Sequence, residues 1–207
     1  AALQGRPVGS GLGAGVGVLL AVLSARALPV WSDDLTLWSA ALQRWPSAHT
    51  AGSLAKVLDD MGRLDEAAAL YEQATAAPPV LQESCYNVTA IHLRRADMAG
   101  IVRAGEAALE AGCVESPELL APLAYGYLMT CDVAAARRAA EQVAADPTGI
   151  AVVVRVAEGM LRGDDGPLLA AMAAHPEHDP APLISQAERL RDAASGCSSG
   201  EPPAAPE

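Results

Sequence analysis

The stretch LAKVLDDMGRLDEAAALYEQATAAPP, residues 54–79, decides the fold of this chain. Apolar or small residues recur in it every three or four residues, as on one face of a helix, with a longer interval between Gly62 and Ala67. This spacing predicts two amphipathic helices joined by a tight turn at Gly62-Arg63. Pro79 has no backbone N–H to donate, so it ends the second helix. The recurring positions are Leu54, Ala55, Leu58, Gly62, Ala67, Tyr71, Ala74 and Pro79.

The block GRLDEAAALYEQA in this stretch resembles the tetratricopeptide repeat, a family built from stacked helical hairpins. The resemblance implies that small side chains at Ala67 and Ala74 let the two helices of a hairpin pack closely. It also implies that Tyr71 fills the gap between neighbouring hairpins. Such hairpins stack into a short α-solenoid, in which each repeat contacts mainly its neighbours.

Degenerate copies of the pattern follow. A step that carries Leu54 onto Val88, and a second that carries Val88 onto Leu123, keep apolar or small side chains at nearly every position. The matching positions are Val88, Thr89, His92, Ala96, Ile101, Gly105 and Ala108, then Leu123, Ala124, Tyr127, Cys131, Ala136, Ala140 and Val143.

Incomplete repeats are expected at both ends of this array. A similar step back carries Tyr71, Ala74 and Pro79 onto Trp38, Ala41 and Pro46. This match predicts a lone second helix in DDLTLWSAALQRWP. Towards the C-terminus we expect a shorter helix pair at residues 150–162 and 167–175. A final helix at residues 183–194 would cap the stack, because terminal repeats are commonly atypical.

The composition favours helices throughout. The 207 residues are 51% hydrophobic but only 3% aromatic, with no Phe. Ala and Leu, which favour helices, are abundant, whereas the residues that suit strands are sparse. We therefore expect an all-α fold. The net charge of −11 and the scattering of the 14 basic residues argue against a nucleic-acid partner, because phosphate binding needs clustered Lys and Arg.

The segment before the repeats carries no charge from residue 7 to residue 25. Its length approaches the roughly 20 residues of a membrane span, and its four-residue glycine spacing lets membrane helices pack closely. We expect a transmembrane helix here, either an anchor or the last span of a larger protein. A signal peptide and a flexible glycine-rich leader are the alternatives. Because the chain begins with Ala1, we expect a fragment or a processed chain.

Three parts follow from these features. Residues 1–30 contain the predicted transmembrane helix, and residues 31–194 form the predicted repeat domain. Residues 195–207 are rich in Ser, Gly, Pro and Glu, which predicts a disordered tail.

The junction SARALPVWSDDLTLWSAALQRWPS resembles the end of bacterial polytopic membrane proteins related to the O-mannosyltransferase-like glycosyltransferases. The resemblance implies a bacterial inner-membrane protein with its repeat domain on the periplasmic side. None of that family's catalytic loops is present, so no catalysis is expected in this segment. The alternative is a stand-alone periplasmic scaffold behind an uncleaved anchor or signal sequence. The matching residues are Arg26, Trp31, Asp33 or Asp34, Leu37, Trp38 and Pro46.

A binding surface is expected on the concave face, which the first helix of each hairpin lines. The acidic and aromatic groups on this face suggest a protein or peptide partner, and the alternative is a face that is simply solvated. The candidate residues are Lys56, Asp59, Asp60, Tyr86, Arg94, Tyr125 and Met129.

Neither a metal site nor a cofactor is expected. His175 and His178 have a suggestive spacing, but prolines interrupt the segment and no further ligands accompany them. Cys85 and Cys113 fall at the same end of one predicted hairpin, so a disulfide between them is possible in an oxidising compartment. The pattern itself favours reduced, buried thiols.

Overall fold

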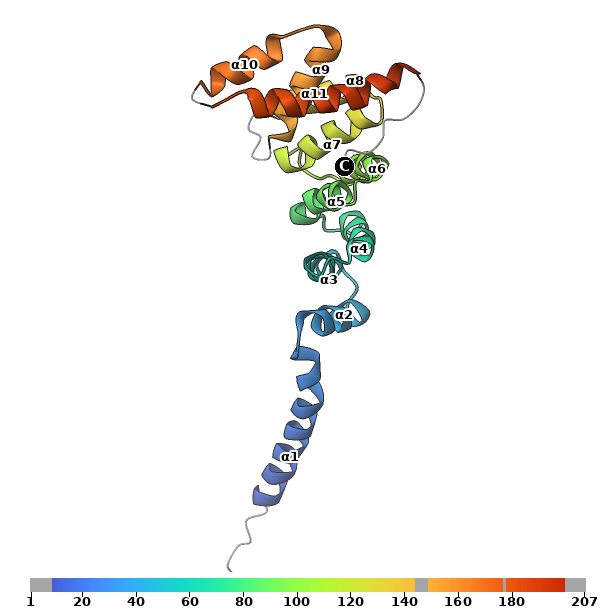
Figure 1. Cartoon of the computed structure of the whole chain (residues 1–207). Helices are drawn as coiled ribbons and strands as arrows, with labels where there is room; N and C mark the ends of the chain where they lie inside the picture. The colour runs from blue at the N-terminus through green and yellow to red at the C-terminus, as the bar shows by residue number, and fades with distance from the viewer. Residues whose placement is uncertain (1–8, 144–148, 177, 200–207) are drawn as a thin grey trace, which may run out of the picture.

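The computed structural model describes residues 9–143, 149–176 and 178–199, and this part of the chain is helical and has no strands. The predicted all-α fold is confirmed (Figure 1). The helices are α1 (Gly9–Ala27), η1 (Leu28–Trp31), α2 (Asp34–Arg44), α3 (Ala48–Asp60), α4 (Leu64–Ala76), α5 (Gln82–Arg94), α6 (Met98–Glu110), α7 (Pro117–Met129), α8 (Val133–Glu141), α9 (Ile150–Arg162), α10 (Gly166–Ala174), α11 (Ala181–Ser195) and η2 (Gly196–Ser199).

The hairpin α3–α4 follows the spacing of residues 54–79. Gly62 adopts a left-handed φ of 75° at the turn, and α4 ends before the Pro78-Pro79 pair. Ala67 and Ala74 are fully buried between helices, and Tyr71 is only 1% exposed. The small side chains therefore stand where close packing requires them.

The same turn recurs along the chain. Gly62, Ala96, Cys131 and Gly163 have φ values of 75°, 53°, 72° and 70°. They follow α3, α5, α7 and α9 in turn, once in each hairpin. A left-handed backbone disfavours side chains other than Gly, so packing of the hairpin enforces it at Ala96 and Cys131. This conformation places the degenerate copies in the predicted register.

Neighbouring hairpins contact one another in chain order, α4 against α5, α6 against α7 and α8 against α9. This arrangement is compatible with an α-solenoid. The core contains many alanines, and glycines allow the closest approaches between helices. A Cβ on Gly105 would lie 2.9 Å from Leu123 Cδ1, and one on Gly126 would lie 2.9 Å from Ile101 Cγ2.

The helix α1 extends away from the stacked helices as a rod (Figure 1). Its apolar side chains are exposed where the structure describes them, including Leu19 at 58% and Leu20 at 57%. No single helix in the described ranges is both long and apolar enough to cross a membrane. The pair formed by Gly15–Trp31 and Asp34–Arg44, bent by 110°, meets those criteria of length and composition together.

The C-terminal helix α11 packs against α9 and also reaches α7. The chain remains helical through residue 199, and a disulfide joins Cys197 in η2 to Cys131. Residues 195–199 therefore differ from the predicted disordered tail, because the disulfide and the packing of α11 hold them. The rest of that tail lies outside the described residues.

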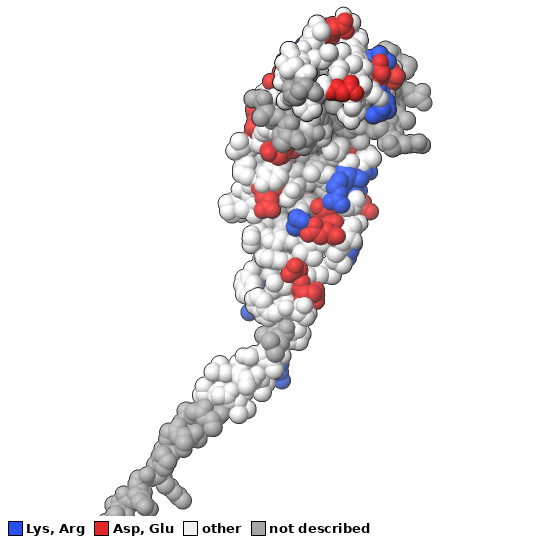
Figure 2. All heavy atoms as spheres, turned by 60° about the vertical axis from the view of Figure 1, so that its left-hand side comes forward, with Lys and Arg blue, Asp and Glu red and all other residues white. Residues whose placement is uncertain are grey.

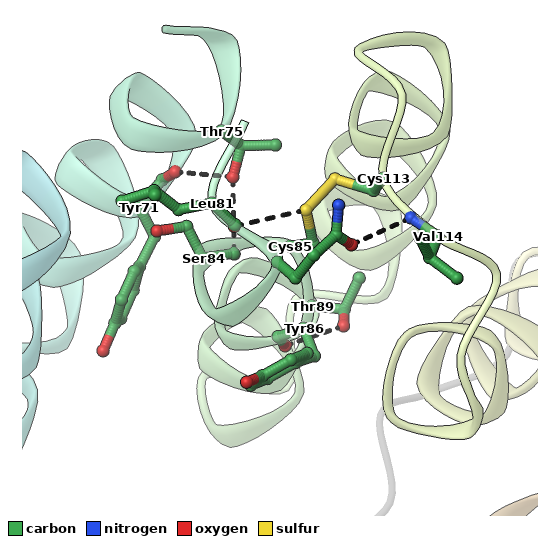
Figure 3. The surroundings of a disulfide bond; sticks show 10 residues. Tyr71, Thr75, Leu81, Ser84, Cys85, Tyr86, Thr89, Cys113 and Val114 are labelled. Atoms are coloured by element: carbon green, nitrogen blue, oxygen red, sulfur yellow. Dashed lines mark hydrogen bonds between the residues drawn. A yellow bond between two sulfur atoms is a disulfide. The ribbon is translucent and has the colours of Figure 1, made fainter. Parts of the chain in front are cut away.

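A second disulfide joins Cys85, at the start of α5, to Cys113, just after α6 (Figure 3). Both residues are buried, with exposures of 1% and 7%. Antiparallel helices bring these two positions together, as the hairpin geometry allowed. The structure thus holds a disulfide where the sequence pattern favoured reduced thiols.

Candidate functional site

A polar hollow of about 290 Å³, which we call the Tyr71 pocket, lies between α2, α3 and the start of α5. Helix α4 contributes Tyr71 to its floor. Close approach of α3 to α5 shapes the pocket, because a Cβ on Gly52 would lie 2.9 Å from Ser84 Oγ. The residues that matter for its chemistry are Asp34, Trp38, Lys56, Asp60, Tyr71 and Glu83.

The phenol oxygen of Tyr71 is buried and has no hydrogen-bond partner among the residues that the structure describes. Leaving a buried hydroxyl unpaired costs about 1–3 kcal/mol. Burial raises the pKa of Tyr71 well above its ordinary value, and the charges of Asp59, Asp60 and Glu83 raise it further. Tyr71 is therefore a neutral hydroxyl that can still donate one hydrogen bond and accept others.

Acidic groups predominate around this hydroxyl. Asp34, Asp60 and Glu83 line the pocket, and Lys56 is the one lysine or arginine among the lining residues. Lys56 forms an ion pair with Asp60 one helical turn away, and both side chains are more than half exposed. An exposed pair of this kind contributes little stability, so the pocket retains a net negative charge and a weakly held cation.

An aromatic wall completes the pocket. The Trp38 and His49 rings meet edge to face with their centroids 5.5 Å apart, and both residues line the hollow. An indole face attracts cations as well as apolar groups. The pocket thus offers carboxylates, a hydroxyl and an aromatic surface to one ligand group.

Two of the predicted binding residues, Lys56 and Asp60, line the Tyr71 pocket. Asp59 forms an ion pair with Arg94 that bridges α3 and α5 beside it. Tyr86 lies partly buried on α5 and is not among the lining residues. Of the residues expected on the binding face, the structure therefore places only Lys56 and Asp60 in the lining of this pocket.

The remaining two predicted residues lie elsewhere. Tyr125 and Met129 line a separate hollow of about 660 Å³ beside α11. Met129 is only 3% exposed and belongs to the hydrophobic core, so it packs in the core as well as lining this hollow. Leu183 and Leu190 of α11 line the same hollow. The C-terminal helix therefore covers this part of the face.

Sequence reasoning missed Asp34, Trp38 and Glu83 as parts of the site. Asp34 and Glu83 lie in the first turns of α2 and α5, where the helix dipole favours acids whatever their function. The sequence predicted Tyr71 as a packing residue, but its spacing does not show where the phenol oxygen lies or whether it has a hydrogen-bond partner. No periodic signal in the sequence would have brought these four residues together.

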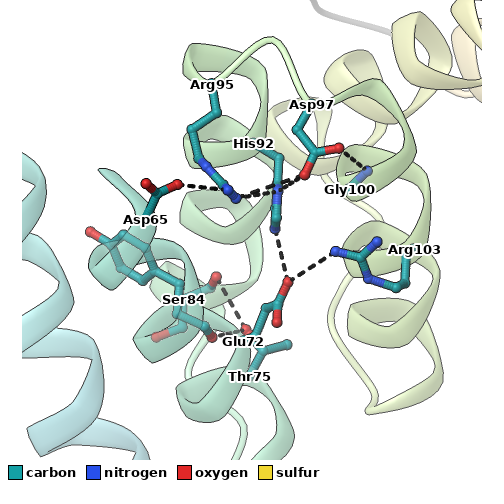
Figure 4. A network of polar contacts seen from close by, with 10 residues as sticks. Asp65, Glu72, Thr75, Ser84, His92, Arg95, Asp97, Gly100 and Arg103 are labelled. Atoms are coloured by element: carbon teal, nitrogen blue, oxygen red, sulfur yellow. Dashed lines mark hydrogen bonds and ion pairs between the residues drawn. The ribbon is translucent and has the colours of Figure 1, made fainter. Parts of the chain in front are cut away.

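A polar network secures the next hairpin (Figure 4). The buried ring of His92 lies between Glu72 of α4, 3.0 Å from Nε2, and Asp97 before α6, 3.1 Å from Nδ1. Asp97 also accepts a hydrogen bond from the Gly100 N–H. Arg103 approaches Glu72 to 3.5 Å. These bonds join three successive helices and hold α5 in its place along the Tyr71 pocket.

A second surface feature lies at the junction with α1. Trp31, the last residue of η1, and Trp45, the residue after α2, are 70% and 68% exposed. Both line an apolar hollow of about 910 Å³. Arg44 lies over the Trp45 ring, 5.8 Å from its centroid. In Figure 2 the acidic and basic side chains colour the helical stack, whereas the described part of the α1 rod is uncharged except near its end, where Arg26 lies.

In comparisons with known proteins, the chain matches no family model and no curated protein.

Proposed function

We propose that this chain is a membrane-tethered tetratricopeptide-like module that binds a protein partner in the Tyr71 pocket, outside the cytoplasm. The observation that carries the proposal is the pocket itself. Its lining includes Lys56 and Asp60, two of the residues expected on the binding face, and its buried hydroxyl lacks a partner within the described residues.

The exposed apolar rod supports the tether. At 1.5 Å per residue, the 19 residues of α1 rise about 28 Å, close to the roughly 30 Å hydrocarbon core of a bilayer. Val18, Leu19 and Leu20 are each more than half exposed, and exposed apolar side chains favour lipid over water. The length and exposure of α1 therefore support the proposed tether, while the criteria of length and composition are met only by Gly15–Trp31 together with Asp34–Arg44.

The bend after α1 supports the same placement. With α1 across a membrane, the 110° turn into α2 would lay α2 along the membrane surface. Trp31 and Trp45 would then lie at the interface, where indole rings are enriched. Two disulfides favour an oxidising compartment over the cytosol.

Membrane attachment can be tested with Leu20→Arg, which would place a charge in the span. The expected cost of about 2.5–3.5 kcal/mol in the membrane predicts loss of the protein from alkali-washed membranes. Leu169→Arg is the matched control, because Leu169 is also exposed, at 61%, but lies on α10. Equal retention of the two variants would contradict the tether.

Partner binding can be tested by placing a photo-crosslinking amino acid at Asn87, which lines the Tyr71 pocket. The control site is Glu110, an exposed residue at the end of α6. We expect a discrete protein adduct from position 87 in the expressing cells and none from position 110. Adducts of the same mass from both sites, or none from either, would contradict the proposal.

The setting of the module follows from the resemblance of its junction. We propose that it forms the tail of a larger glycosyltransferase-like membrane protein, with a stand-alone scaffold as the alternative. The gene sequence upstream of Ala1 distinguishes them, because several further apolar spans fit only the first.

A further inference from the structure

We propose that the Tyr71 pocket recognises a lysine or arginine side chain of the partner protein. This inference rests on the proposed function and adds the chemistry by which the partner is recognised. It begins from Tyr71, a residue that is 1% exposed and lines the pocket, and whose buried hydroxyl has no hydrogen-bond partner in the described part of the chain.

The charge around the hydroxyl selects a cation. Asp34, Asp60 and Glu83 face the same hollow from three helix segments, against the single cation of Lys56 among the lining residues. An anionic ligand would meet repulsion from these three carboxylates, whereas an ammonium or guanidinium group would be attracted. The Trp38 ring adds a surface that stabilises cations and also packs against the aliphatic stem of a basic side chain.

The shape of the pocket favours a side chain over a metal ion. No group of three or more His, Cys, Asp or Glu side chains in the described ranges converges closely enough to hold a metal. The carboxylates instead come from three different helices, α2, α3 and α5. The volume of about 290 Å³ lies just below the range of about 300–1,000 Å³ for small-molecule sites, which suits a single side chain.

The hydroxyl adds a reason to expect a peptide. A basic side chain alone carries no acceptor, so it cannot use the hydrogen-bond donor of Tyr71. A peptide segment offers both groups, a basic side chain for the carboxylates and a backbone carbonyl that accepts from the phenol. Burial of the hydroxyl without a partner in the free protein is then compensated in the complex.

Lys56 has a defined role in this account. Its ammonium occupies Asp60 in the free protein, and the pair is exposed. An incoming basic side chain would take its place on Asp60. Removing Lys56 should therefore strengthen binding, by up to about fivefold given the 0.2–1 kcal/mol of such exposed pairs.

The test uses the full chain, isotope-labelled and held in detergent micelles, followed by nuclear magnetic resonance. The probes are acetylated, methylamidated lysine, norleucine and glutamate, titrated one at a time. The reporters are the amide signals of Gly52 and Ser84 and the indole signal of Trp38. We expect saturable shifts with lysine alone, in the millimolar range that corresponds to about 4 kcal/mol.

Variants with opposite expected signs sharpen the test. Tyr71→Phe and Glu83→Gln should weaken lysine binding at least fivefold, and Lys56→Met should strengthen it. Tyr127→Phe is the matched control, because its hydroxyl already donates to Glu106 Oε1 at 2.8 Å, away from the pocket. Far-ultraviolet circular dichroism checks that each variant is folded. Because Glu83 is exposed, Glu83→Gln still provides the test if Tyr71→Phe does not fold.

The inference is overturned if norleucine binds as well as lysine, if lysine moves none of the reporters, or if Glu83→Gln and Tyr71→Phe bind like the unaltered chain. Crosslinking from Asn87 separates this failure from that of the proposed function. A protein adduct at Asn87 without lysine binding would contradict only the recognition of a basic side chain and would leave the proposed partner site in place. If neither a protein adduct at Asn87 nor lysine binding is observed, the pocket is not a partner site.

Discussion

Replacing the buried disulfide Cys85–Cys113 by two alanines should destabilise the chain by several kcal/mol. The bridge closes a loop of 28 residues. The bridge restricts the unfolded chain, so removing it returns entropy to the unfolded state. This change corresponds to about 3.6 kcal/mol at 25 °C. That is a large share of the 5–15 kcal/mol typical of folded domains. Alanine is the appropriate replacement, because both sulfurs lie in apolar surroundings where a serine hydroxyl would add a cost of its own.

Equilibrium urea unfolding followed by circular dichroism measures this loss. With an m-value of about 2–3 kcal/mol/M, the midpoint should fall by about 1–2 M. The matched variant removes Cys131–Cys197, whose loop of 66 residues predicts a loss of about 4.4 kcal/mol. An unchanged midpoint for Cys85→Ala/Cys113→Ala under oxidising conditions would refute the reasoning. Rapid alkylation of the native cysteines before unfolding would refute the bridges themselves.

Three further results are expected. Ala96→Gly should stabilise the chain and Gly62→Ala should destabilise it, each by about 1 kcal/mol, because both positions have positive φ; thermal unfolding of the pair checks the opposite signs. Burial opposes ionisation of Asp97, but bonds from Gly100 and His92 outweigh it and lower its pKa. Its stabilisation is therefore present at neutral pH and lost as pH falls below about 4. The gap in stability between the unaltered chain and Asp97→Ala, about 1 kcal/mol at neutral pH, should therefore shrink on acidification. Burial and then the bond to Glu106 raise the pKa of Tyr127 to about 12, so Glu106→Gln should lower that pKa in a resonance titration of the ring. The loss of stability that begins near pH 10 should then end at a lower pH and be smaller.

Local spacing in the sequence predicted the hairpins well. The positions of Gly62 and Tyr71 depend on contacts within one or two neighbouring helices. Their roles are therefore visible in the spacing that repeats from one hairpin to the next. Helix ends followed equally local rules, as at Asp33, whose side chain accepts from the Thr36 N–H and caps α2.

The long-range features escaped the pattern. Met129 has the spacing of a surface residue on a first helix, but α11 returns over it from far along the chain. Cys197 lies in a segment whose composition suggests disorder, and its disulfide to Cys131 depends on where α11 ends. The surroundings of the Tyr71 hydroxyl are formed by side chains from four helices, and no periodic spacing in the sequence indicates how these helices come together.

The side of the membrane on which the repeats lie tests the central claim most directly. Glu110→Cys would introduce one exposed thiol, while the structure pairs the native cysteines in disulfides. A membrane-impermeant maleimide is then applied to intact cells with a permeabilised outer barrier, and the membranes are washed at alkaline pH. We predict labelling of position 110 before lysis and retention of the protein in the membrane pellet. Labelling only after lysis, or release by alkali, would contradict a membrane-tethered module outside the cytoplasm.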